Sequence, residues 1–157
     1  MADDYEVVNS SGSEGSGSID NRILITLDLN AKIPSALVSA KQGDDEGRKI
    51  CVTFSEDGNT WAIPSGVRAG FRFRKADGHV IYNATTGHED DNINIDENTI
   101  VITLTAECLS AAGRGYADVI LEDSEHHTIS TSPFILDVIP SPQVGASIVS
   151  GDEFTYL

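Results

Sequence analysis

Hydrophobic and polar residues alternate along most of the chain. In the first alternating segment, Ile23, Ile25 and Leu27 fall on one face of an extended backbone. Thr26 and Asp28 fall on the opposite face. A period of two residues is typical of a β-strand that is buried on one side. The same alternation predicts further strands over residues 36–40, 48–54, 67–74, 79–83, 93–95, 99–104, 116–122 and 128–139.

Short segments rich in Gly, Asp and Asn separate these predicted strands. Asp57 and Gly58 form a hairpin signal, and the Ala-Asp-Gly turn at residues 76–78 predicts a hairpin over residues 67–83. Pro133 lies inside the last predicted strand. Because proline has no backbone N–H, we expect a bulge or a sheet edge at that position.

One segment favours a helix, at residues 105–112, where Thr105 is a candidate N-cap and Gly113 a candidate stop. Its length, about two turns, is that of a connector. Several short strands at spacings of roughly 8–12 residues, without a strand–helix–strand alternation, are typical of a sandwich. The sequence therefore predicts an all-β protein: an antiparallel β-sandwich, immunoglobulin-like or jelly-roll-like, with one short connector helix.

The 157 residues divide by composition into one domain with two tails. Residues 1–20 are acidic and rich in Gly and Ser, and we expect them to form a flexible N-terminal arm. Residues 21–140 are the expected β-sandwich domain, and residues 141–157 a C-terminal extension. The first residues lack the cationic start and the apolar run of a secretory signal.

Acidic residues outnumber basic ones by 25 to 10, which gives a formal net charge of −15 at pH 7. A duplex-binding protein neutralises phosphates with clustered Lys and Arg, so we expect no nucleic-acid partner. The same excess argues against a basic membrane-surface site, and the apolar runs are far shorter than the ~20 residues that span a bilayer. All basic residues lie between Arg22 and Arg114, so both ends of the chain are anionic.

The sequence contains no motif of a catalytic or cofactor site, and we expect no enzymatic activity and no cofactor. Cys51 and Cys108 are too few for a disulfide scaffold; we expect free, buried thiols, with a single disulfide as the alternative. Neighbouring strand residues face opposite ways, so His126 and His127 are expected in a solvated turn rather than a shared metal site. We expect the acidic residues 89–91 to form a solvated loop, with a calcium site as the alternative.

Residues at three places are candidates for contacts with partner proteins. Arg68, Arg72 and Arg74 share one face of a predicted strand. They either pair with acids of neighbouring strands or receive an acidic partner surface, such as the tail of another copy. The two terminal segments carry apolar residues that could become ordered on docking. Their candidate contact residues are Tyr5, Val7 and Val8 near the N-terminus, and Val144, Ile148, Phe154 and Tyr156 near the C-terminus.

Four motifs in a fixed order are similar to those of a known family. They are Lys41-Gln-Gly-Asp44 ahead of strand 48–54, FRFRKADG at residues 71–78, GRGYADVILED at residues 113–123, and ISTSPFILDV at residues 129–138. Together, over roughly Ile23 to Pro140, they resemble the N-terminal domain of phage baseplate upper proteins.

This resemblance implies a virion component. In that family the β-sandwich docks on the tail or baseplate, and a C-terminal extension carries fibres or receptor-binding proteins outward, usually as trimers. This chain departs from the pattern because it ends at Leu157, soon after the predicted sandwich. We therefore expect a structural or adaptor protein of a phage tail or baseplate, made in the cytoplasm of the bacterial host. The expected partners are other virion structural proteins and further copies of the chain, with a trimer favoured by the resemblance.

Other functions remain open from the sequence. A capsid accessory or head-fibre attachment protein would use the same stable β-domain and arms. A carbohydrate-binding β-sandwich would use exposed aromatic residues, for which Trp61, Tyr82 and Tyr116 are the candidates. A hydrolase would need a nucleophile and a base that the fold alone brings together.

Overall fold

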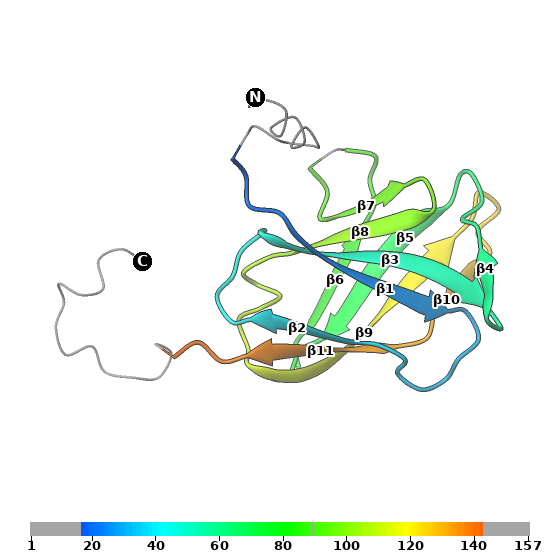
Figure 1. The fold of residues 1–157 in the computed structure, drawn as a ribbon. Coiled ribbons are helices and arrows are strands. Elements are labelled where there is room, and N and C mark those ends of the chain that lie inside the picture. The colour runs from blue at the N-terminus through cyan, green and yellow to red at the C-terminus, as the bar shows by residue number, and fades with distance from the viewer. Residues whose placement is uncertain (1–16, 89, 143–157) are drawn as a thin grey trace, which may run out of the picture.

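The computed structural model describes residues 17–88 and 90–142, which form two β-sheets packed face to face (Figure 1). The first sheet has the order β1-β3-β8-β7, and β4 pairs with β3. The second sheet has the order β2-β11-β9-β5-β6, and β10 pairs with β9. The strands of the first sheet are β1 (Asn21–Asp28), β3 (Arg48–Glu56), β4 (Asn59–Trp61), β7 (Ile93–Asp96) and β8 (Thr99–Leu104). Those of the second are β2 (Leu37–Lys41), β5 (Arg68–Arg74), β6 (Val80–Ala84), β9 (Gly113–Glu122), β10 (Thr128–Ser130) and β11 (Phe134–Ile139).

The predicted all-β sandwich is confirmed, and both of its sheets are mixed. β1 lies parallel to β3, β2 lies parallel to β11, and the remaining pairs are antiparallel. The path of the chain explains the parallel pairs. After β1 the chain crosses to the second sheet as β2 and then returns beside β1 as β3. Parallel neighbours need such a crossover connection, whereas a tight hairpin joins only antiparallel strands.

The predicted helix at residues 105–112 is wrong: no helix occurs between residues 17 and 142 outside the undescribed position 89. The segment makes a single turn, in which the Leu109 N–H donates to the carbonyl oxygens of Thr105 and Ala106, both at 3.2 Å. The Thr105 hydroxyl accepts the N–H of Cys108 at 3.4 Å, so the expected cap does form. The side chains of Cys108 and Leu109 are completely buried in the core. A single turn carries the free-energy cost of helix nucleation, and no further residues extend it to offset that cost.

The structure settles two other predictions about strands. The hairpin over residues 67–83 is confirmed as β5 and β6, joined by a turn in which Gly78 has a φ of 91°. The last predicted strand is interrupted next to Pro133 and forms β10 and β11. At the interruption, the Ser132 N–H donates to the Asp28 carbonyl of the first sheet at 2.9 Å. The chain therefore leaves the ladder of β9 where proline could not donate to it.

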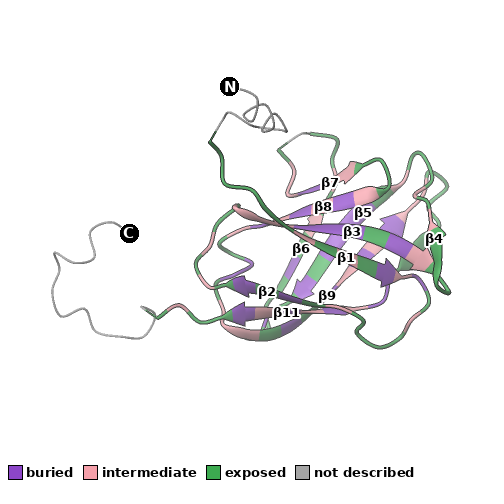
Figure 2. Ribbon diagram, in the orientation of Figure 1, coloured by how far each residue is buried: buried purple, intermediate pink, exposed green. Residues whose placement is uncertain are grey.

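The inward-facing residues of both sheets form one apolar core (Figure 2). Phe71 is fully buried and stacks on Phe73 and Phe134, with ring centroids 6.1 and 6.4 Å apart. Both cysteines are free and buried, as predicted. The described residues include no helix long and apolar enough to cross a membrane.

The chain enters and leaves the sandwich at the same end, which we call the tether end (Figure 1). The N–H of Asn21, at the start of β1, donates to the carbonyl of Gly47 at 2.8 Å. The carbonyl of Ile139, at the end of β11, accepts the N–H of Gln42 at 2.8 Å. Gln42 and Gly47 both belong to the loop between β2 and β3, so this single loop contacts both exits. The β3–β4 and β9–β10 turns lie at the opposite end, which we call the far end.

Candidate docking surfaces

The outer face of the second sheet carries cross-strand ion pairs between β5 and β9. Arg68 lies opposite Glu122, and their side chains are 2.6 Å apart. Arg72 lies opposite Asp118 and donates two hydrogen bonds to its carboxylate, at 2.9 and 2.7 Å. This paired geometry with Asp118 raises the pKa of Arg72. The pairs are exposed and add little stability, but they neutralise both arginines.

Arg74 has a different environment from the other two arginines of β5. Its cross-strand neighbours are Val80 on β6 and Tyr116 on β9. It forms no ion pair with any residue in the described ranges 17–88 and 90–142. Of the three predicted contact arginines, Arg74 is therefore the one whose charge no described residue neutralises. Their contact with partner proteins stays a prediction.

Apolar residues extend on both sides of Arg74 across the sheet. Val80, Tyr116 and Leu37 are each more than half exposed, at 57, 53 and 53%. The strand registers align Leu37 with Ile135, Ile135 with Tyr116, Tyr116 with Arg74, and Arg74 with Val80. We call these five residues the outer row. Beside it lies an open hollow of about 350 Å³, to which Arg74, Val80 and Tyr116 contribute. Exposed Tyr and Arg side chains at the centre of an apolar surface are typical of binding hot spots.

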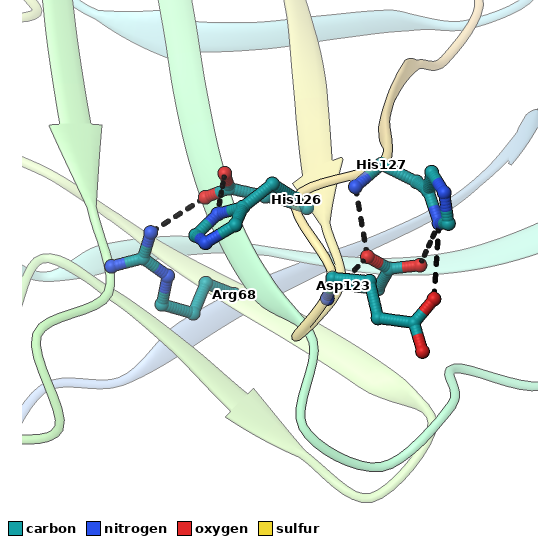
Figure 3. Close-up of polar contacts among 6 residues, drawn as sticks. Arg68, Asp123, His126 and His127 are labelled. Atoms are coloured by element: carbon teal, nitrogen blue, oxygen red, sulfur yellow. Dashed lines mark hydrogen bonds and ion pairs between the residues drawn. The ribbon is translucent and has the colours of Figure 1, made fainter.

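The β9–β10 turn at the far end holds the two adjacent histidines, each beside a different carboxylate (Figure 3). His126 Nδ1 lies 3.1 Å from Glu122, and His127 Nδ1 lies 2.9 Å from Asp123. The Asp123 carboxylate also accepts the backbone N–H groups of Glu125 and His127, at 2.9 and 2.8 Å. Asp123 thus closes the turn, and both imidazoles are largely exposed, at 80 and 76%. This agrees with the predicted solvated turn.

The same contacts shift the carboxyl groups of this turn. The Arg68 guanidinium and then His126 lower the pKa of Glu122, because each hydrogen bond favours the ionised form. The backbone N–H of His127 is the main cause that lowers the pKa of Asp123. These groups are therefore ionised at neutral pH and give the far end an acidic character.

The loop between β6 and β7 carries part of the acidic segment 89–91. Asp91 accepts hydrogen bonds from the N–H and the hydroxyl of Thr86, at 2.5 and 2.6 Å. These bonds lower the pKa of Asp91 and occupy its oxygens within the loop. Among the described residues, no three His, Cys, Asp or Glu side chains are placed to hold a metal ion.

The remaining predicted contact residues belong to the two terminal segments of the chain. Those in both terminal segments, namely Tyr5, Val7, Val8, Val144, Ile148, Phe154 and Tyr156, lie outside the described residues. The sequence did not single out the outer row as a surface. Alternation puts Tyr116 on the same side of β9 as Asp118, but only the register shows that Tyr116, Arg74 and Ile135 are neighbours.

The fold and these surfaces define the class of the protein: a two-sheet β-sandwich with an exposed apolar row on one sheet. The family model described as the BppU N-terminal domain, in which BppU stands for baseplate upper protein, matches residues 21–157. The chain belongs to this family, which confirms the resemblance found in its motifs.

A solved structure described as the N-terminal domain of phage TP901-1 ORF48 is similar to the chain. The sequence identity is 17%, the TM-score is 0.59, and the similarity covers 76% of this chain and 98% of that chain. At this identity the similarity shows a shared fold. No curated protein matches the chain.

Membership of the family identifies the chain as a structural component of a phage baseplate. Its location is the virion, and its partners include other virion proteins.

Proposed function

We propose that the chain is an adaptor of the baseplate, which docks on the particle through its β-sandwich and anchors fibres or receptor-binding proteins through its terminal segments. The position of the two exits supports this division. Asn21 and Ile139 both hydrogen-bond to the β2–β3 loop, so the sandwich begins and ends at the tether end. The outer row and the far end are then left for contacts made by the folded domain.

In this proposal the adaptor is a homo-oligomer, with a trimer as the expected order, and it is made in the host cytoplasm. It has no enzymatic activity. In support, the carboxylates of the far-end turn and of the β6–β7 loop already accept hydrogen bonds from arginine, histidine, the Thr86 hydroxyl or backbone N–H groups. Such groups are stabilised as anions that maintain local structure, which is the opposite of the raised pKa that a general acid requires.

The test removes the terminal segments from the gene in the phage. Particles carrying the chain shortened to residues 21–142 should retain the sandwich at the baseplate and lose the attached fibres, as counted by electron cryomicroscopy. Two single truncations, one at each terminus, identify the segment that holds the fibre. Normal fibre number in the doubly shortened phage would show that the arms do not anchor it.

A further inference from the structure

In the outer row, no residue of the described ranges balances the charge of Arg74. Rows on both sides contain cation–anion pairs: Arg72 with Asp118 on one side and Arg114 with Asp137, 3.9 Å apart, on the other. Between them, Arg74 is flanked by apolar and aromatic side chains. A ligand for this row therefore needs an acidic group to meet Arg74 and apolar groups to cover its neighbours.

Two segments outside the described residues combine acidic with apolar residues, namely residues 3–8 and residues 152–156, and only the second lies within the family match. Residues 152–156 read Asp-Glu-Phe-Thr-Tyr, which is two acids followed by aromatic residues at alternate positions. The family match runs to residue 157, so this segment belongs to the region that the family model covers. In an extended conformation Phe154 and Tyr156 share one side, which suits a flat sheet face.

At its described C-terminal end, the chain runs away from its own outer row. β11 runs from the outer row, at Ile135, toward the tether end, at Ile139. Pro140 and Pro142 follow directly, and residues before proline favour extended conformations. Between Ile139 and Asp152 lie 12 residues, so the chain takes 13 steps from one to the other. At about 3.3 Å per residue they can span up to about 43 Å, enough to reach a neighbouring sandwich.

We propose that residues 152–156 of one copy bind the outer row of a second copy, with the acidic pair at Arg74 and the aromatic side chains against Tyr116 and Val80. This contact rests on the proposed homo-oligomer and supplies its interface. It joins two different surfaces, the tail of one copy and the sheet of the next. Head-to-tail contacts form a ring where the rotation between copies closes, and three copies in a ring would make the expected trimer.

Sedimentation equilibrium of the full purified chain near physiological salt tests the contact. The wild-type chain should self-associate with increasing concentration. The variant Arg74→Glu should weaken association by about tenfold or more, because it replaces attraction with repulsion. Lys32→Glu is the matched control: Lys32 is exposed in the loop between β1 and β2 and has no ion pair among the described residues, so the same charge change there should leave association unchanged. Circular dichroism checks that each variant is folded, and exposed Arg74 should tolerate the change.

A mixing experiment identifies the tail as the partner of the row. A second variant, with Asp152→Lys and Glu153→Lys, should also associate more weakly than the wild-type chain when it is alone. Mixed with the Arg74→Glu chain it should associate again, in open or even-numbered assemblies in which the two variants alternate. There the reversed tail meets the reversed row, and the native tail meets the native row. A monomeric wild-type chain, normal association of Arg74→Glu, or no recovery on mixing would each overturn the contact. The number of copies per baseplate, counted in particles, tests the proposed oligomer separately.

Discussion

A single added methyl group at Gly115 tests the close contact between β5 and β9. Gly115 is buried in β9, on the face of the second sheet that packs against the core. A Cβ at this position would overlap the backbone carbonyl oxygen of Arg74 and the ring of Phe73. The carbonyl belongs to a strand that is paired on both sides, so it cannot move without disturbing the ladder. Overpacking of this kind costs about 1–3 kcal/mol.

We therefore expect Gly115→Ala to lower the free energy of unfolding by about 1–3 kcal/mol, measured by urea denaturation. Each kcal/mol should lower Tm by about 2–4 °C in a domain of this size. The steric loss should exceed the gain of about 0.5–1 kcal/mol that alanine brings to a strand by reducing backbone entropy.

Gly70→Ala is the matched control in the neighbouring strand β5. The nearest atoms that its Cβ would meet belong to Tyr82, whose side chain is 57% exposed and can rotate away. Its free energy of unfolding should change by less than about 1 kcal/mol. Equal effects of the two substitutions, or a neutral Gly115→Ala, would refute the argument that backbone contact decides the cost.

Three further predictions concern the core, the far end and the thiols. Phe71→Ala should destabilise the domain by about 3–5 kcal/mol in denaturant unfolding, because the fully buried ring leaves a cavity between the sheets; a loss below 1 kcal/mol would contradict the packing. Because the pKa values of Glu122 and Asp123 are lowered in the folded state, their stabilising contribution is complete above their ordinary values of 4.5 and 3.8. It should decline as the pH falls below that range toward the lower folded values; urea midpoints that stay constant between pH 6 and pH 3 would argue against it. Cys51 and Cys108 should react with a thiol reagent only after unfolding, and rapid reaction of both in native buffer would contradict their burial.

The strands could be predicted from the sequence because each has a strong local signal. Alternating Ala69, Phe71 and Phe73 mark β5, and the Asp-Gly turn before β6 fixes the hairpin. The false helix also arose from local signals. Thr105 does cap a turn, but burial of Leu109 outweighs helix propensity, and that burial depends on the rest of the fold.

Strand order and register could not be predicted, and the outer row depends on both. The parallel pairing of β2 with β11 joins residues almost 100 positions apart, as in Leu37 with Ile135. No local pattern encodes which strands become neighbours across such a distance. The sequence placed Arg68, Arg72 and Arg74 on one face, yet only their partners on β9 and β6 show that Arg74 differs.

The charge distribution distinguishes the far end of the domain from the outer row. The far end displays Glu56, Asp57 and Glu125, in addition to the ionised Asp123. The terminal segments are acidic as well, so a tail from another copy is repelled from the far end. Repulsion between exposed charges acts over about 8 Å at physiological ionic strength, which is enough to act at contact. The outer row, with the unpaired Arg74 at its centre, is where an acidic segment meets attraction instead. The same negative charge that argues against a duplex nucleic-acid partner thus favours the proposed contact with one face of another copy.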